Sequence, residues 1–357
     1  YRQRRSHSAP VLVQKNKLAK LLLKQLAFEL TAAQIKVSAE ISRDLAAAHP
    51  MQRLLQGDVG SGKTIVAALA ALQAIENGFQ AALMAPTEIL AEQHFQKLSA
   101  WFDPLGIQVV WLSGSQKKKQ KQAALDDIAL GTAQLAVGTH ALFQDQVVFH
   151  QLGLAIIDEQ HRFGVHQRLA LRMKGALSNT VPHQLMMSAT PIPRTLSMSY
   201  FADLDVSIID ELPPGRAPIV TKLIADNRRD EIIARIQHAC QQGKQVYWVC
   251  PLIEESETLQ LQTAMETYES LSQIFPDLSV GLVHGRLATQ EKTAVMASFK
   301  QGEIQLLVAT TVIEVGVDVP NASLMVIENA ERMGLSQLHQ LRGRVGRGSE
   351  ASICILL

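Results

Sequence analysis

The sequence predicts an α/β protein with two lobes, each formed by a mainly parallel sheet flanked by helices. Residues 57–64 read Gly-Asp-Val-Gly-Ser-Gly-Lys-Thr, which fits the phosphate-loop pattern and stands between a strand pattern and a helix pattern. From about Met51 to Asp205, apolar runs alternate with helical patterns, as expected for βαβ units on a parallel sheet. The same alternation restarts after a proline-rich stretch. A chain of 357 residues is long enough for two such domains.

The first lobe is expected over residues 49–210, after a helical lead-in. Residues 1–48 read as helical and amphipathic, with four leucines on one face: Leu18, Leu21, Leu22 and Leu26. Leu54-Leu55 ends a strand ahead of the phosphate loop, and residues 64–75 form a strong helix pattern after it. The further strands expected in this lobe are Ala81–Ala85, Val109–Leu112, Leu135–Gly138, Leu154–Ile157 and Gln184–Ser188.

A linker is expected at residues 211–218, because its three prolines can continue neither a helix nor a central strand. The second lobe then covers residues 219–357. Its expected strands are Ile219–Ile224, Gln245–Cys250, Val280–Val283, Gln305–Ala309 and Ser323–Ile327. Its expected helices are Arg229–Gln241, Thr258–Gln273 and Gln290–Phe299.

Composition sets broad limits on function. Lys and Arg total 34 against 33 Asp and Glu, and this balance neither predicts nor excludes nucleic acid as a partner. The lysine run 117–121 suggests contact with nucleic acid, but a solvated loop or helix start is the preferred interpretation. Three cysteines without metal-ligand spacing indicate a reducing compartment, with Cys250 and Cys354 packed in strands. No run approaches the ~18 apolar residues of a membrane span, and no signal-peptide pattern is found, so a cytoplasmic protein is expected.

The phosphate loop predicts a nucleotide site. Its glycines, Gly57, Gly60 and Gly62, leave room for backbone amides to turn inward around phosphates. Lys63 supplies a charge for the β- and γ-phosphates, and the Thr64 hydroxyl can reach a magnesium ion. The following helix presents the positive end of its dipole to the same phosphates. The expected ATP-binding residues are therefore Gly57, Asp58, Val59, Gly60, Ser61, Gly62, Lys63 and Thr64.

Two carboxylates supply the second half of a nucleotide-hydrolysing site. The apolar run 152–157 is typical of a strand buried in a parallel sheet, and Asp158 and Glu159 follow at its carboxyl end. Asp158 is placed to hold magnesium through water, and Glu159 to orient or deprotonate the attacking water. Acidic pairs after strands are common, so the prediction depends on the phosphate loop that precedes them.

An arginine-rich segment near the end of the chain suits a polyphosphate. Arg342, Arg344 and Arg347 stand among glycines, and a guanidinium presents a fixed fork to phosphate oxygens. Supplied across a cleft to a γ-phosphate, one of them would make hydrolysis conditional on closure of the lobes. The alternative is a basic helix that faces solvent, which has no use for the glycines at 343, 346 and 348.

Seven segments resemble, in order, the motifs of superfamily-two helicases, whose motor consists of two RecA-like P-loop NTPase lobes. They are Gly57–Thr64, Ala85–His94, Val137–His140, Asp158–His161, Ser188–Thr190, Ala309–Asn321 and Gln340–Arg347. Four longer stretches are similar to the RecG family of bacterial branched-DNA helicases: Asp158–Val165, Ser188–Thr195, Asp210–Arg216 and Val249–Ser256. The resemblance extends over nearly the whole chain from about Phe28.

The resemblance implies a role for each matching residue. Gln34 would contact the adenine base, the alternative being a glutamine that faces solvent. Contacts with the DNA backbone are implied for Pro86, Thr87, Gly138, Thr139, His140, Thr310 and Thr311. Gly316 and Asp318 would lie between DNA and nucleotide, and Ser188, Ala189 and Thr190 would couple the two sites. Gln340 would sense the nucleotide, and Arg344 and Arg347 would face its phosphates, with Arg347 as the finger.

The implied protein is an ATP- and Mg²⁺-dependent motor that remodels branched DNA in the repair and recombination pathways of a bacterial cytoplasm. It would be monomeric, with DNA as its partner and a single-stranded-DNA-binding protein as a partner of the parent chain. The family's wedge domain and helical-hairpin motif have no counterpart here, so the motor core alone is expected. The alternatives are the motor of a transcription-repair coupling translocase, a protein translocase, and a nucleotide-gated binding module without turnover. No substrate-clamp insertion is seen between Ala189 and Pro213, which argues against the protein translocase.

Overall fold

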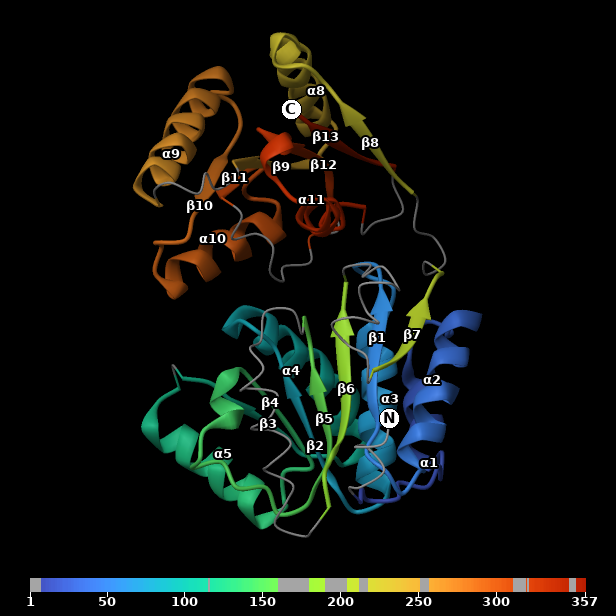
Figure 1. Ribbon diagram of the computed structural model, residues 1–357. Coiled ribbons are helices and arrows are strands. Elements are labelled where there is room, and N and C mark those ends of the chain that lie inside the picture. Colours follow the sequence, from blue (N-terminus) through green and yellow to red (C-terminus); the bar gives the residue numbers. More distant parts are fainter. Residues whose placement is uncertain are drawn as a thin grey trace. The chain divides into compact units, whose positions relative to one another are not determined.

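The chain divides into two compact units, Tyr1–Leu212 (unit 1) and Pro213–Leu357 (unit 2). The computed structural model describes residues 8–114, 116–159, 180–189, 204–211, 218–250, 257–310, 319, 321–346 and 351–357. Each unit contains one sheet flanked by helices (Figure 1). The two-lobe α/β fold predicted from the sequence is therefore confirmed.

The sheet of unit 1 has the strand order β3-β4-β2-β5-β6-β1-β7, and its pairings are parallel. Because the strands are parallel, their carboxyl ends lie along one edge of the sheet, where open α/β sheets bind ligands. All of the strands expected in this unit are present, and β7 was not predicted. The strands are β1 Gln52–Gly57, β2 Gln80–Met84, β3 Val109–Leu112, β4 Leu135–Gly138, β5 Leu152–Ile157, β6 His183–Ser188 and β7 Asp205–Ile209.

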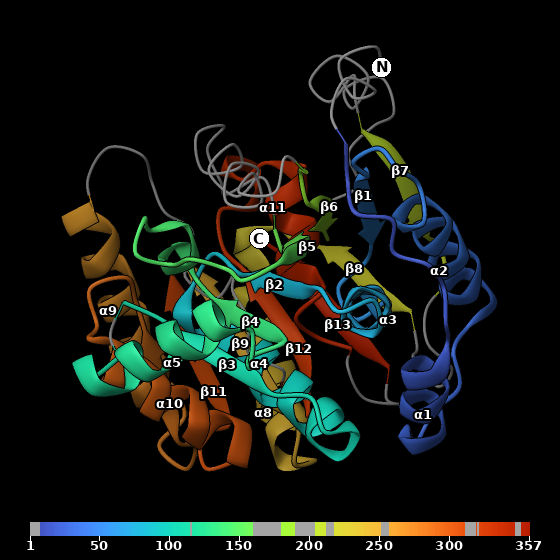
Figure 2. The same ribbon diagram turned by 90° about the horizontal axis from the view of Figure 1, so that it is seen from below.

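Helices cover both faces of this sheet. Successive strand residues point to opposite faces, so Ala81 and Leu83 join the core under α3, while Ala82 and Met84 join the core under α5. The strongly apolar α3 is buried between the sheet and the pair α1 and α2 (Figures 1 and 2). The helices are α1 Lys17–Gln25, α2 Ala32–Leu45, α3 Lys63–Glu76, α4 Glu88–Phe102 and α5 Lys118–Leu130, with short 3₁₀ turns η2 Asp103–Leu105 and η3 His140–Phe143.

The lead-in is only partly helical, which corrects the prediction for residues 1–48. Residues 9–16 form neither a helix nor a strand, and the N–H groups of Ala9 and Leu12 donate to carbonyl groups near the end of α2 at 2.9 Å. On α1, Leu22 is buried and Leu18 packs partly against the core, but 43% of Leu21 is exposed. A nine-residue helix on the outside of α3 buries only a narrow stripe of its surface, so the four leucines cannot all face the core.

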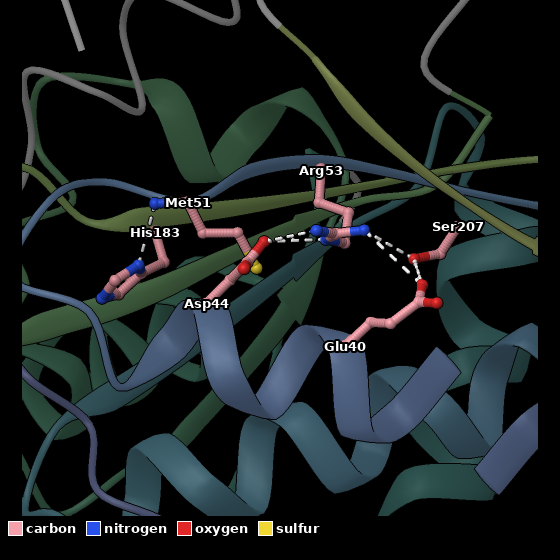
Figure 3. Close-up of polar contacts among 6 residues, drawn as sticks. All are labelled: Glu40, Asp44, Met51, Arg53, His183 and Ser207. Carbon is pink, nitrogen blue, oxygen red and sulfur yellow. Dashed lines mark hydrogen bonds and ion pairs between the residues drawn. The ribbon is translucent and has the colours of Figure 1, made fainter. Parts of the chain in front are cut away.

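Arg53 fixes α2 to the sheet (Figure 3). Its guanidinium, on β1, donates to Asp44 of α2 at 2.8 Å and to Ser207 of β7 at 2.8 Å. Glu40 of α2 lies 3.6 Å from the same group and accepts a hydrogen bond from Ser207. The arginine side chain is 12% exposed, so a largely buried charge joins three elements of unit 1.

The sheet of unit 2 has the order β10-β11-β9-β12-β13-β8, again with parallel pairings. One core lies under α8 and α9 and the other under α10 and α11. The expected strands and helices of this lobe are confirmed to within two residues. The strands are β8 Ile219–Leu223, β9 Gln245–Cys250, β10 Val280–Val283, β11 Leu306–Thr310, β12 Ala322–Ile327 and β13 Ser352–Leu356; the helices are α8 Arg229–Gln241, α9 Glu257–Ile274, α10 Thr289–Gln301 and α11 Leu335–Arg342, with 3₁₀ turns η6 Asp226–Arg228 and η8 Ala330–Arg332.

The structure also bears on the cysteines, the lysine run and the possibility of a membrane-spanning helix. Cys250 and Cys354 are buried in β9 and β13, as predicted, and burial raises the pKa of each thiol to about 12. The lysine run ends an exposed turn and starts α5, so the solvated interpretation is confirmed. Among the helices that the structure describes, none combines the length and apolar character needed to cross a membrane.

Candidate nucleotide-binding site

The phosphate loop has the backbone that its glycines predict. It leaves the carboxyl end of β1 and enters α3 at Lys63, with Gly62 as the N-cap. Gly60 and Gly62 have φ of 81° and 90°, in the left-handed region that side chains disfavour. A Cβ on Gly57 would lie 2.5 Å from Ser61 Oγ. A side chain is therefore disfavoured at all three positions, in a turn that folds tightly on itself.

Lys63 closes over this loop. Its Nζ donates to the carbonyl of Gly57 at 2.7 Å and to that of Asp58 at 3.0 Å, and the N–H of Ser61 donates to Asp58 O at 3.0 Å. The ammonium group thus lies at the mouth of the loop, at the N-terminus of α3. A cation and a helix N-terminus at one place favour an anionic ligand.

Gln34 lies against the loop rather than in solvent. It is 3% exposed, and its Nε2 donates to Ser61 O at 2.8 Å. Its Oε1 accepts from Thr31 N–H at 3.0 Å, and its own N–H donates to Thr31 Oγ1, which forms a capping box at the start of α2. The alternative of a solvent-facing glutamine is therefore wrong. Contact with an adenine base stays a prediction.

Asp158 is held from both sides at the end of β5. Its Oδ2 lies 2.7 Å from His94 Nε2, its Oδ1 accepts from Glu159 N–H at 3.0 Å, and its own N–H donates to Met84 O at 2.8 Å. Burial by itself raises the pKa of this carboxyl group. The hydrogen bond and charge of His94, the charge of Lys63 and the Glu159 N–H outweigh burial, so the pKa of Asp158 is lowered. A carboxylate is therefore maintained close enough to Lys63 to interact with it.

Glu159 has a φ of 49°, which is uncommon for a residue with a side chain. This turn directly after β5 brings its N–H to the Asp158 carboxylate. Residues in such conformations are retained where the surroundings impose them, often at functional sites.

Ser188 and Ala189 lie between the loop and Asp158. Strand β6 is placed between β1 and β5, and Ser188 pairs in register with Gln56, the residue before Gly57. Both residues are buried at the carboxyl edge of the sheet. Thr190, the third residue of the expected coupling segment, lies outside the described residues.

The residues expected to contact DNA follow two further strands at the same edge. Pro86 and Thr87 are partly exposed between β2 and α4, and Thr87 caps α4 by accepting from Leu90 N–H at 3.4 Å. After β4, His140 is exposed but Thr139 is 2% exposed, and no described residue partners its hydroxyl. A phosphate contact by Thr139 stays a prediction. Gly138 is required because a Cβ there would collide with Leu112 O.

In unit 2, Thr310 ends β11 and Gln340 lies on α11, both buried. Arg344 follows α11 and is 7% exposed, so the alternative of a basic helix facing solvent is wrong for this arginine. Of the glycines used in that argument, Gly346 has a φ of 72°, but Gly343 has helical angles that any residue adopts, which corrects the prediction for it. Four predicted residues of this unit lie outside the described ones: Thr311, Gly316, Asp318 and Arg347.

Sequence reasoning missed His94. It stands in the helicase-like segment 85–94, but no role was assigned to it. The sequence offered one indication of a role for it. His94 stands seven residues after Thr87, about two helical turns, so both residues lie on the same face of α4. Only the fold shows that this side faces Asp158.

Comparison with known proteins agrees with this geometry. The model of the DEAD/DEAH box helicases matches residues 31–199, and that of the helicase conserved C-terminal domain matches residues 228–349. The ATP-dependent DNA helicase RecG of Escherichia coli K12 is 64% identical over 354 residues, which are 99% of this chain and 51% of that protein. The chain belongs to the RecG family. The RecG of Pasteurella multocida is 62% identical over 98% of this chain and 51% of that protein.

A solved structure of RecG bound to a three-way DNA junction has the same fold. It matches with a TM-score of 0.82 and 44% identity over 99% of this chain and 46% of that chain. The two units are thus RecA-like lobes. The chain spans about half the length of the RecG relatives that it matches.

The residues present fit ATP with Mg²⁺. The tight loop can approach phosphates closely, and the Thr64 hydroxyl and Asp158 carboxylate offer the oxygen ligands that Mg²⁺ prefers. Mg²⁺ commonly combines one or two such ligands with substrate phosphates and water.

Proposed function

We propose that the chain is the ATP-hydrolysing motor of a helicase that remodels branched DNA. The observation that carries the proposal is the pairing of the phosphate loop with the deprotonated Asp158 at one sheet edge, in electrostatic reach of Lys63. Family membership and the match to a RecG structure with a three-way junction support the choice of DNA.

In this proposal the loop amides from Gly57 to Thr64 and the Lys63 ammonium bind the phosphates of ATP. Thr64 and Asp158 hold Mg²⁺, which when bound would neutralise charge on the β- and γ-phosphates. Glu159 orients the attacking water and takes its proton, while Gln34 contacts the base. The actions of Gly316, Asp318, Gln340, Arg344 and Arg347 on the same nucleotide stay predictions.

DNA would be bound through its backbone. The expected contacts follow neighbouring strands at the carboxyl edge of unit 1 and the end of β11 in unit 2. They are Pro86, Thr87, Gly138, Thr139 and His140 in unit 1, and Thr310 and Thr311 in unit 2. Hydroxyl groups and strand-end amides position a backbone but do not read base sequence. Ser188, Ala189 and Thr190 would couple this path to ATP. A monomer in a bacterial cytoplasm, with a single-stranded-DNA-binding protein as a partner of the parent protein, is what the family resemblance implies.

ATP hydrolysis measured under five conditions tests the proposal: with forked DNA, linear duplex DNA, RNA or unfolded polypeptide, and with no polymer. The expected result is a rate that is highest with forked DNA and abolished in Lys63→Ala. Equal stimulation by linear duplex would favour a transcription-repair coupling translocase instead. Stimulation by unfolded polypeptide but not by DNA would favour a protein translocase, and ATP binding without turnover under any condition would favour a gated binding module.

A further inference from the structure

The Asp158–His94 contact joins two elements that have different tasks in the proposed motor. His94 Nε2 lies 2.7 Å from Asp158 Oδ2, and both side chains are 9% exposed. An ionised carboxylate only accepts hydrogen bonds, so Nε2 carries the proton and donates. Within the described residues, the other donor to this carboxylate is the backbone N–H of Glu159. His94 is thus the side chain that fixes the orientation of the carboxylate.

His94 also connects Asp158 to the turn proposed to contact DNA. This turn, Ala85–Thr87, links β2 to α4. On its strand side, Met84 O accepts from Asp158 N–H at 2.8 Å. On its helix side, α4 starts at the Thr87 cap and carries His94 to the same aspartate. The turn is therefore bracketed by two hydrogen bonds to one residue, and α4 is a rigid connection of two helical turns, about 10 Å.

We propose that His94 is a positioning residue, which holds the Asp158 carboxylate for Mg²⁺ and transmits the state of the Ala85–Thr87 turn to it. This inference rests on the proposed function, because it assigns Mg²⁺ to Asp158 and DNA to the turn. It follows that Mg²⁺ affinity depends on His94 and on DNA. By linkage, DNA affinity depends equally on Mg²⁺-nucleotide.

A purely structural role for His94 would predict a different result. A buried histidine that only fills space contributes to stability and leaves metal affinity alone. Partners that orient a metal ligand typically change metal affinity 10- to 100-fold when they are removed. The test therefore needs a metal-binding readout in proteins of matched stability.

The test uses fluorescent mant-ATP binding to the whole chain, titrated with Mg²⁺, with and without forked DNA. The variants are His94→Gln, whose amide nitrogen reaches the position of Nε2, and His94→Asn, whose amide nitrogen stops short of it. We expect the Mg²⁺ midpoint of His94→Gln within about 3-fold of the unaltered chain and that of His94→Asn raised about 10-fold or more. Forked DNA should shift the midpoint of the unaltered chain and of His94→Gln, but not that of His94→Asn.

His183→Asn is the matched control. His183 is also a buried histidine of unit 1, but it bonds to Met51 and Pro10, so its loss should lower stability without moving the Mg²⁺ midpoint. Equal midpoints for folded His94→Gln and His94→Asn would overturn the positioning role. The coupling would be overturned if forked DNA did not shift the Mg²⁺ midpoint of the unaltered chain, or if it shifted the midpoint equally in all variants. Failure of the proposed function itself would appear as no nucleotide binding by the unaltered chain.

Discussion

Gln34 Nε2 donates a 2.8 Å hydrogen bond to the carbonyl oxygen of Ser61, which ties the start of α2 to the phosphate loop. The same nitrogen occupies the space that a Cβ on Gly62 would need. Gly62 is therefore required twice, for its φ of 90° and for the packing of Gln34. The segment expected to bind the base and the loop expected to bind the phosphates form one structural element.

Because of this relationship, Gly62→Ala should lower the free energy of unfolding through two separate effects. Gly78 has a similar φ of 83° with nothing near its Cβ position, so Gly78→Ala measures the conformational strain alone, about 1 kcal/mol. We expect Gly62→Ala to lose about 2 kcal/mol more, from the collision with Gln34. Adding Gln34→Ala should recover part of that loss. Urea unfolding of five proteins provides the values: the unaltered chain, Gly78→Ala, Gly62→Ala, Gln34→Ala and the double variant. Strictly additive losses from Gly62→Ala and Gln34→Ala would contradict the packing argument.

Lys63→Ala and Glu159→Gln should affect different steps. Lys63 meets the phosphates in the ground state, so its loss should weaken nucleotide binding. Glu159→Gln should retain binding and abolish turnover, because an amide is not a base. Binding of mant-ATP and steady-state hydrolysis separate the two. Near-parental hydrolysis by Glu159→Gln would show that another group activates the water.

His183 should make stability depend on pH. Its Nδ1 accepts from Met51 N–H at 3.0 Å and its Nε2 donates to Pro10 O at 2.7 Å, an arrangement that requires the neutral ring. Burial lowers the pKa of His183 below its ordinary value, against opposing contributions from Pro10 and Asp44. Below about pH 6.5, His183 is protonated in the unfolded chain but stays neutral in the folded chain until a lower pH. Stability is therefore lost as the pH falls below about 6.5, by up to about 1.4 kcal/mol per unit.

His183→Asn provides the comparison, because its side-chain oxygen can still accept from Met51 and does not titrate. Its unfolding free energy should be lower at pH 7.5 but should fall less steeply between pH 6.5 and 5. Identical slopes for the two proteins in urea titrations would rule out His183 as the source.

Arg53 should contribute more to stability than an exposed ion pair does. Arg53→Lys keeps the charge but cannot reach Asp44 and Ser207 together, and Arg53→Ala leaves Asp44 and Glu40 without their cation. We expect losses of about 1 and about 2 kcal/mol, the second equivalent to a fall in Tm of roughly 4–8 °C. Arg228→Ala, which removes an exposed pair with Glu231, is the control and should leave Tm unchanged. Equal effects at both sites would contradict the role of burial.

DNA binding should depend strongly on salt and little on sequence. The candidate contacts are hydroxyls, strand-end amides and an exposed histidine, which suit phosphates rather than base edges. Affinity for a forked DNA and for its scrambled counterpart, measured at several salt concentrations, should fall steeply and in parallel. A marked preference for one sequence at equal structure and salt would argue for base readout.

Local sequence patterns were sufficient for most of the fold. Local patterns of apolar periodicity and glycine placement, which act over a few residues, predicted the phosphate loop, most strands of both sheets and helices such as Arg229–Gln241. Strand β7 escaped prediction because it is a short edge strand, buried only at Ser207 and Ile209, just before a proline-rich stretch. The non-helical segment 9–16 was not predicted because its backbone partners lie at the end of α2, more than 30 residues away.

For the candidate site, the sequence by itself determined the residue types: a lysine and three glycines in a loop, and two carboxylates after a buried strand. Tertiary structure alone decided what surrounds them. The contacts of His94 with Asp158 and of Gln34 with Ser61 join residues 64 and 27 positions apart. Such contacts depend on strand order and on which elements pack against each other, and neither is encoded in the local periodicity of a chain.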